Sequence, residues 1–391
     1  MNLQSAKAAR IPTTAITGLI VDVLSKVGVP VDDASKIAAL MLEADLVGAD
    51  AHGVFRLPQY SQRLRLGSTN SRPKITVNRT APATALVDGD NGMGHLVVAR
   101  AAETAIELAR ECGVAWVGCR MSGHAGAAGV YAALPLKADM VGLYSAVANA
   151  NHMPLAGGAE PVLGTNPLAI AIPAGKEPPV VLDIATSIVS YGTIKNHRLQ
   201  NMPLQGDWMI DPKTGNAVTD PHKSAEALLL PMAGYKGAGL ALTLGLLAGT
   251  LNGALFGRDC VDFNAEPDKV TNTGQFVVAL DPGRFQPIDQ FKAEVDRHIR
   301  ELRSSKALPG QSVRLPGDHR AQRRADRQRN GIPLAPELLV QLDKLAADLS
   351  IKPLRERNQA APLHHITAVL KWPEIAWNRV EPWLIVINLK R

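Results

Sequence analysis

One uncharged stretch constrains the fold of this 391-residue chain more than any other part of its sequence. From Gly237 to Gly257 it reads GAGLALTLGLLAGTLNGALFG, which is long enough to span a bilayer. Glycine and alanine fill nearly half of the stretch, polar residues interrupt it, and the chain has no second stretch of this kind. Three glycines at four-residue spacing let another backbone approach closely: Gly245, Gly249 and Gly253. We therefore expect a buried, closely packed helix of a soluble protein rather than a membrane span.

The overall composition is that of an ordinary globular chain, long enough for two domains and a substantial core. Aromatic residues make up only 4%, so the core has to consist of Leu, Val, Ala and Ile. The net charge of +6 suits an anionic partner, and small acids or dinucleotide phosphates qualify as readily as nucleic acid.

The cysteines and the N-terminal residues indicate in which cellular compartment the protein is expected. Cys112, Cys119 and Cys260 form neither an even disulfide framework nor a metal-ligand spacing, so we expect free thiols in a reducing compartment and no metal. The first 30 residues lack the apolar region and the small-residue cleavage site of a secretory signal. A cytoplasmic location is the expectation.

The order of elements predicts an α/β protein. Residues 13–66 have helical periodicity, with Thr13 or Thr14 and then Asp32 or Asp33 as possible caps. Another helix is expected from Val97 to Cys112, ended by Gly113. Short apolar runs separated by Gly, Asn and Pro then predict strands, among them GVAWVGCR, MVGLYSAV, PLAIAIPA, PVVLDIA and QFVVAL.

The last third of the chain is expected to be largely helical. Basic helical material runs from Asp289 to about Arg329, and PLAPELLVQLDKLAADL is a clear amphipathic helix. We expect a helical domain formed by residues 1–75 with 286–351, an α/β domain over 76–285, and a C-terminal extension over 352–391 whose role the sequence does not define.

The segment GADAHGVFRLPQY carries the most informative pair of side chains. If it is helical, His52 and Arg56 lie one turn apart on one face. An imidazole beside a permanent guanidinium is a poor structural pair, because neither satisfies the charge of the other. It is a good arrangement for holding a carboxylate next to a proton donor.

Other motifs allow both a structural and a functional interpretation. In RMSGHAGAAGVYAA, Ser122 and the backbone before a helix either meet a phosphate or only cap that helix, and His124 is either functional or incidental. Thr165, in GTNPLAIAIP, either sits in an ordinary turn or hydrogen-bonds a substrate carboxylate. Asp183 either pairs with a nearby imidazole or caps the next helix. Lys236 is either exposed or neutralises a phosphate. GDNGMGH lacks the third glycine and the preceding strand of a Rossmann fingerprint, so it predicts a tight turn.

Taken together, these pieces resemble the malate/L-lactate dehydrogenase family, which also holds sulfolactate, ureidoglycolate and diketogulonate dehydrogenases and the piperideine/pyrroline-2-carboxylate reductases. The resemblance extends over residues 10–350 and rests on motifs in family order: ADLVGADAHGVFRLPQY, VDGDNGMGH, SGHAGAAGVYA, GGAEPVLGTNPLAIAIP, VVLDIATSIVSYG, LLPMAGYKGAGLAL and RLPGDHRAQRRADRQRNGIPL.

The resemblance implies a non-Rossmann NAD(P)-binding fold with a mixed sheet core and a helical domain. It also implies a homodimer and reversible hydride transfer at the carbon next to a carboxylate, with NAD or NADP and NADH slightly favoured. His52 matches the proton donor, Arg56 the carboxylate-binding arginine, His124 a second histidine described in some members as the acid/base, and Thr165 a substrate contact. The positions matching cofactor-binding segments are Ser122, His124, Val181, Leu182, Asp183, Ile184, Ala185, Thr186, Ser187, Tyr235, Lys236, Gly317, Asp318 and His319.

The chain departs from the family pattern close to the expected site. Ala51 stands where the family usually has serine, so a water or Asp183 has to orient His52. Tyr235 and Ala238 replace a His and a Tyr common in malate and lactate members, and the run Ala146 to Ala148 replaces a more polar one. These changes favour a substrate other than plain malate or lactate.

The resulting prediction is an NAD(P)H-dependent reductase of a 2-oxo acid, with His52 as proton donor and Arg56 holding the carboxylate. A cyclic imino acid reductase is the alternative. A non-catalytic homologue remains open because of Ala51, and a nucleic-acid-binding protein because of the basic run from Lys292 to Arg329. That run lacks interleaved aromatic residues and is diluted by acids, so a solvated helix face explains it better, and we expect neither a nucleic acid nor a membrane as partner.

Overall fold

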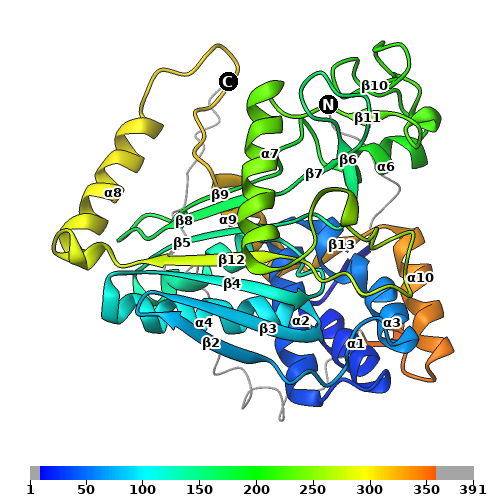
Figure 1. Cartoon of the computed structure of the whole chain (residues 1–391), viewed down its shortest axis with the longest axis horizontal. Coiled ribbons are helices and arrows are strands. Elements are labelled where there is room, and N and C mark those ends of the chain that lie inside the picture. Colours follow the sequence, from blue (N-terminus) through cyan, green and yellow to red (C-terminus); the bar gives the residue numbers. More distant parts are fainter. Residues whose placement is uncertain (1–8, 358–391) are drawn as a thin grey trace, which may run out of the picture.

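The computed structural model describes residues 9–357 and is built around one mixed sheet of seven strands, as the α/β prediction requires (Figure 1). The strands, in their order across the sheet, are β2 (Thr76–Ala81), β3 (Thr84–Gly92), β4 (Val114–Ser122), β12 (Gln275–Leu280), β5 (Val141–Ala146), β8 (Leu168–Ile172) and β9 (Val180–Ile184). Only β3 and β4 are parallel, and the helix α4 (Gly94–Cys112) connects them. Gly113 ends α4 in the left-handed conformation, as predicted.

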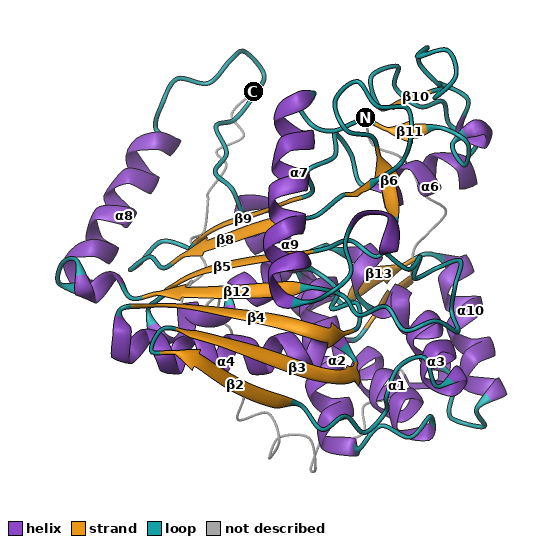
Figure 2. Ribbon diagram, in the orientation of Figure 1, coloured by secondary structure: helices purple, strands orange, loops and turns teal. Residues whose placement is uncertain are grey.

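Helices lie on both sides of the sheet, with α4 on one side and α7 (Tyr235–Ala248) on the other (Figure 2), and alternate residues of the central strands pack toward one side or the other. Val277 and Ala279 of β12 join α4 and the short helix α5 (Ala128–Ala132) in the largest apolar cluster. Phe276 packs on the opposite face with Val147, Leu244 and Ala248, and its ring stacks on that of Trp116 at 4.2 Å between centroids. The sheet is therefore covered on both faces.

Both ends of the described chain meet in a second, helical cluster. It packs α1 (Thr13–Lys26), α2 (Val31–Leu46) and α3 (Leu57–Leu66) with α10 (Pro336–Asp348), beside the strand pair of β1 (Ala9–Ile11) and β13 (Ile332–Leu334). The predicted caps of the first two helices are wrong. Pro12 and Pro30 occupy the N-cap positions, and neither helix has a side-chain cap.

Residues just beyond the predicted boundary at 352 still belong to this cluster. Leu354 is completely buried, and Arg357 pairs with Asp22 at 2.7 Å. The remainder of the predicted extension, from residue 358, lies outside the described residues.

The glycine-rich stretch forms α7 (Tyr235–Ala248), which is shorter and less buried than expected. Its inner face packs on the sheet, but Leu246, Leu247 and the following Leu251 are 42%, 39% and 62% exposed. Gly245 is needed where it stands, because a Cβ there would lie 2.0 Å from the Phe256 ring. Within residues 9–357, no helix combines the length and apolar character that crossing a membrane requires.

A small lobe sits beside α7. It contains β6 (Asn151–Met153), β7 (Leu163–Gly164), α6 (Tyr191–Leu199), β10 (Met209–Ile210) and β11 (Leu228–Leu229), gathered around a separate apolar cluster (Figure 1).

The basic segment is not one helical region with a solvated face. It forms α8 (Ile288–Arg303) and α9 (Asp318–Asn330), separated by a loop that contains Pro309, Gly310 and Pro316. Arg324 and Arg327 of α9 are each only 8% exposed, so the solvated-face interpretation is wrong for them.

Candidate active site

The segment with His52 and Arg56 is a pair of tight turns rather than a continuous helix. One 3-10 turn spans Asp50–His52, a second spans Val54–Arg56, and Gly53 lies between them. The buried carboxyl group of Asp45 holds this joint, because its Oδ2 accepts a hydrogen bond from the Val54 N–H at 2.9 Å. A Cβ on Gly53 would lie 1.9 Å from Asp45 Oδ1, so only glycine fits there. Burial raises the pKa of Asp45 to about 8.

Arg56 is half-buried and surrounded by neutral oxygen atoms. Its Nε donates to the Ala51 carbonyl at 2.8 Å, and its Nη1 donates to Gln59 Oε1 at 2.7 Å and to Asn264 Oδ1 at 3.2 Å. Among residues 9–357, no carboxylate lies within ion-pair distance of this guanidinium. Burying a cation without a counter-charge is costly, which makes Arg56 a natural receptor for an anion.

The loop that brings Asn264 to Arg56 is fixed by another arginine, which the sequence analysis did not identify. Arg63 is 2% exposed and donates to the carbonyls of Phe263, Glu266 and Lys269, while its guanidinium lies 4.8 Å from the centre of the Phe263 ring. Its place seven residues after Arg56 is the only trace of this role in the sequence.

His124 lies next to His52, with the two rings nearly parallel and their centroids 5.9 Å apart. Its Nδ1 accepts from the Gly126 N–H at 3.2 Å and is 2.7 Å from the Tyr60 hydroxyl. A backbone N–H can only donate, so this hydrogen-bond network assigns the His124 proton to Nε2 and makes Tyr60 a donor. His124 can therefore donate a hydrogen bond from Nε2 while remaining neutral.

Both imidazoles are held in the neutral form. Burial, followed by the charges of Arg56 and Arg320, lowers the pKa of His52 to about 4. Burial is also the main cause that lowers the pKa of His124 well below its usual value, with Arg56 and His52 adding to it.

Asp183 finds a different partner from the expected imidazole. Its Oδ2 lies 3.0 Å from Nη1 of Arg320, on α9, and accepts from the Gly129 N–H at 3.0 Å. Asp183 does not cap the following helix either, because Ser190 does so by accepting from the Thr193 N–H. Arg320 was not among the predicted site residues, because it lies within the basic run and no spacing distinguishes it there.

The predicted cofactor segment from Val181 to Ser187 leaves β9 and turns toward α7. The N–H and the hydroxyl of Thr186 both donate to the Thr165 carbonyl at 3.0 Å, which ties these two predicted positions together. Ser187 donates to the Val189 carbonyl at 2.7 Å. Ser122 is completely buried and donates to the Gly123 carbonyl at 3.3 Å, which points to a packing role, and its contact with a cofactor stays a prediction.

Two helix N-termini approach this segment. Tyr235 and Lys236 open α7, and Tyr235 is 71% exposed. Gly317 precedes α9 at φ 98°, where a Cβ would lie 3.2 Å from Val181 N. The carboxylate of Asp318 forms an ion pair with Arg303 at 2.7 Å and accepts a hydrogen bond from the Leu315 N–H at 2.8 Å. The Nε2 atom of His319 lies 2.5 Å from Nη1 of Arg314.

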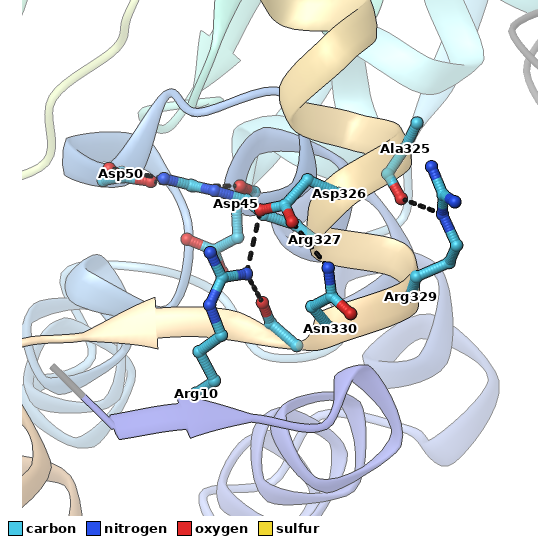
Figure 3. Close-up of polar contacts among 9 residues, drawn as sticks. Arg10, Asp45, Asp50, Ala325, Asp326, Arg327, Arg329 and Asn330 are labelled. Atoms are coloured by element: carbon cyan, nitrogen blue, oxygen red, sulfur yellow. Dashed lines mark hydrogen bonds and ion pairs between the residues drawn. The ribbon is translucent and has the colours of Figure 1, made fainter. Parts of the chain in front are cut away.

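Two further arginines of α9 are buried and pair with acids of the helical region. Arg324 Nε lies 2.8 Å from Glu43 Oε1. Arg327 bridges Asp50, in the turn that ends at His52, and the backbone carbonyl of Asp45 (Figure 3). Arg323 and Arg329 of the same helix are exposed, and Arg329 donates to the Ala325 carbonyl.

The sequence profile of the malate/L-lactate dehydrogenase family matches residues 11–343. The chain belongs to this family. The fold and the enzyme class follow from that membership, and the chain is an NAD(P)-dependent hydroxyacid dehydrogenase.

Relatives of known function cover most of the chain. Malate/(S)-sulfolactate dehydrogenase of Methanothermus fervidus is 34% identical over 334 residues, which is 85% of this chain and 96% of that protein. Ureidoglycolate dehydrogenase (NAD(+)) of Escherichia coli O157:H7 is 31% identical, over 82% of this chain and 91% of its own length. A (2R)-3-sulfolactate dehydrogenase (NADP(+)) of Chromohalobacter salexigens is 31% identical, over 79% and 90%.

Solved structures share the fold. Sulfolactate dehydrogenase from Methanocaldococcus jannaschii superposes with a TM-score of 0.82 at 33% identity, covering 89% of this chain and 99% of that one. Δ1-piperideine-2-carboxylate reductase from Pseudomonas syringae gives 0.76 at 27% identity, covering 86% and 100%.

Proposed function

We propose that this enzyme reversibly reduces a 2-oxo acid to a 2-hydroxy acid, with Arg56 holding the carboxylate and His52 exchanging the proton. The observation that carries this proposal is the guanidinium of Arg56. It is half-buried, contacts only neutral oxygens among the described residues, and lies on the turn that follows His52. A carboxylate supplies the missing charge and can accept two parallel hydrogen bonds from the guanidinium.

The side chains divide the chemistry between them. Arg56 fixes the carboxylate, so that the adjacent carbonyl oxygen is presented to the ring nitrogens of His52 and His124. His124 donates from Nε2 and orients the carbonyl oxygen. His52 delivers the proton to that oxygen as the carbon is reduced, and takes it back in the oxidation.

Binding of the substrate prepares His52 for this role. The positive charge of Arg56 contributes to the low pKa of His52. A carboxylate on Arg56 cancels that contribution, so the pKa of His52 rises when the substrate binds, and the imidazole becomes able to hold the proton it has to give.

The residues around β9 fit a nicotinamide dinucleotide. Lys236 and the α7 N-terminus offer positive charge and backbone N–H groups, with no acidic side chain in the first turn of that helix. Gly317 and Val181 bring a second helix N-terminus to the same strand. NADH or NADPH would be held by these groups and by residues 181–187, and the nicotinamide supplies the hydride. Asp183 and Arg320 keep this wall of the site in place.

A cyclic imino acid is the second candidate substrate. It is supported by the similarity to a piperideine-2-carboxylate reductase and by the low pKa of His52, since a protonated imine carries its own proton. The test is a panel of 2-oxo acids and cyclic imino acids, each with NADH and with NADPH, followed by nicotinamide absorbance. We expect turnover of at least one 2-oxo acid. Turnover of imines alone would favour the second candidate, and no turnover at all would leave a non-catalytic homologue.

We also propose that the enzyme is a cytoplasmic homodimer, with separate helical and α/β domains. Leu246, Leu247 and Leu251 form an exposed apolar stripe on and after α7, which a second copy can cover. Light scattering should give twice the chain mass, and Leu247→Lys should shift the mass toward the monomer. A monomeric wild-type protein would contradict this proposal.

A further inference from the structure

Two segments from distant parts of the chain reach the turn that carries Arg56. A Cβ on Gly192, in the first turn of α6, would lie 3.5 Å from the Cβ of Ala51. The Phe263 N–H donates to the Asn149 carbonyl at 2.8 Å, which ties the segment before β6 to the loop that contacts Arg56. Side chains of α6 and β6 therefore line this part of the site.

These two segments bring together a pair of flat rings. The ring of His152, on β6, stacks on that of Tyr191, in the first turn of α6, with 3.8 Å between centroids and 4° between planes. Within residues 9–357, the half-buried imidazole makes no second ring contact and no hydrogen bond. Burial lowers the pKa of His152 to about 4, so the ring is neutral. His152 therefore has one ring face on Tyr191 and a second, uncharged face to offer a ligand.

The charges around Arg56 call for one anion. Burial and the charge of Arg56 lower the pKa of Lys195 on α6, while the charge of Asp262 acts on Lys195 in the opposite direction. Arg198 of the same helix is exposed, so water and salt screen its charge. Arg56 and Lys195 together exceed Asp262 by one positive charge, which a single carboxylate on Arg56 cancels. A second anion would enter this part of the site without a counter-charge.

Aromatic side chains gather here in a chain that has few of them. Aromatic residues make up only 4% of the sequence. Phe55, on the same turn as Arg56, is 43% exposed, and the guanidinium carbon of Arg56 lies 5.6 Å from the centre of its ring. The carboxylate receptor thus has an exposed ring on its own turn and the stack of His152 and Tyr191 nearby. Such surroundings favour a flat, uncharged group on the ligand.

We infer that the substrate is a singly charged 2-oxo acid with an aromatic side group, and that His152 selects this group by stacking on it. The inference rests on the proposed function, because it assumes that Arg56 holds the carboxylate next to the reacting carbon. The side group then lies on the second face of His152 and continues the stack that begins at Tyr191. A charged side group in the same place would meet a neutral ring and lose its hydration.

Four 2-oxo acids test the inference on the wild-type enzyme. Phenylpyruvate carries the aromatic group, 3-cyclohexyl-2-oxopropanoate a saturated ring of similar size, pyruvate only a methyl group, and oxaloacetate a second charge. We expect kcat/KM for phenylpyruvate to exceed that for pyruvate and for oxaloacetate roughly ten- to hundredfold, because a buried ring adds apolar contact. It should exceed that for the cyclohexyl compound about two- to tenfold, because only the flat ring stacks.

Substitutions of His152 then locate the selecting residue. His152→Leu keeps an apolar side chain but removes the flat ring, so the advantage of phenylpyruvate over the cyclohexyl compound should disappear while the KM for pyruvate changes little. His152→Phe should retain that advantage, because it restores a flat ring. Arg198→Gln, which removes an exposed cation of α6, is the control and should leave the selectivity unchanged.

Four results would overturn the inference and leave the proposed function intact. They are equal kcat/KM for phenylpyruvate and pyruvate, a wild-type preference for oxaloacetate, unchanged selectivity in folded His152→Leu, and an effect of that substitution confined to the KM for NADH or NADPH. The last result would assign His152 to the cofactor. If the wild-type enzyme reduces no 2-oxo acid, the proposed function fails and this inference fails with it. Thermal unfolding shows which variants are folded, and the wild-type comparison needs none of them.

Discussion

Two arginines in this molecule carry the same charge but have opposite surroundings. Arg324 is 8% exposed and its Nε lies 2.8 Å from a carboxylate oxygen of the buried Glu43. Arg56 is half-buried, and its partners are a backbone carbonyl and two side-chain amide oxygens. Arg324 comes with its own carboxylate, because an uncompensated charge in the interior destabilises the fold. Arg63 is also structural, and three backbone carbonyls and the Phe263 ring surround its charge. Arg56 has neither a carboxylate nor such a set of carbonyls and lies on the turn after His52, so we infer that its anion comes from outside.

The largest effect is expected at His52, which lies beside Arg56, the arginine proposed to bind the substrate. His52→Gln removes the proton donor but keeps a polar side chain, so kcat should fall by ~10²–10⁴. The Kd for NADH or NADPH should stay the same, because His52 acts only at the substrate. Stopped-flow hydride transfer measures the first quantity and fluorescence titration the second. Near-normal turnover would contradict the assignment of His52.

Removing the structural arginine should have the opposite signature. Arg324→Met leaves the Glu43 carboxylate buried without its partner, which should lower the free energy of unfolding by about 3–5 kcal/mol. The kcat of the fraction that remains folded should stay close to that of the wild type. Denaturant titration measures the free energy of unfolding, and turnover divided by the concentration of folded enzyme gives the kcat. A folded, inactive Arg324→Met protein would mean that the distinction between the two arginines is wrong.

A smaller effect is expected at the hydroxyl that fixes His124. Tyr60→Phe removes the donor to Nδ1 and leaves only the Gly126 N–H, so His124 loses part of its preference for the Nε2–H form. We expect kcat to fall about tenfold, in line with the loss of one hydrogen bond in a buried site. The ¹⁵N shifts of the imidazole report the tautomer, and unchanged shifts would contradict this role of Tyr60.

The smallest signal is in the pH dependence of the oxidation, which needs His52 unprotonated. The acidic limb of kcat/KM, which reports the free enzyme, should lie near pH 4 rather than near 6.5. The limb of kcat should lie at higher pH, because the bound carboxylate cancels the charge of Arg56 and raises the pKa of His52. If the acidic limbs of kcat and kcat/KM lie at the same pH, the charge of the bound substrate does not change the pKa of His52.

The sequence was sufficient where local chemistry determines the outcome. The α/β class and α4 with Gly113 at its end follow from periodicity and from glycine. The segment before α4 was predicted wrongly: a strand, β3, does precede it and leads through Met93 into α4, and the left-handed residues are Asp90 and Asn91 rather than the glycines. The sequence was also insufficient where partners come from distant segments. Neither the pairing of Asp183 with Arg320 nor that of Glu43 with Arg324 can be deduced from spacing, because about 137 and 281 positions separate the partners. For the same reason the contact of Asn264 with Arg56 was not foreseen.

The central claim is that Arg56 is the receptor for the carboxylate of the substrate. Calorimetric titration of oxamate, an unreactive analogue of a 2-oxo acid, into the enzyme saturated with NADH or NADPH tests it most directly. Replacing Arg56 with methionine should weaken binding by about 10²–10³-fold, because the carboxylate then enters the site without a counter-charge. The free energy of unfolding should stay the same or increase. Oxamate affinity equal to that of the wild-type enzyme would contradict the account.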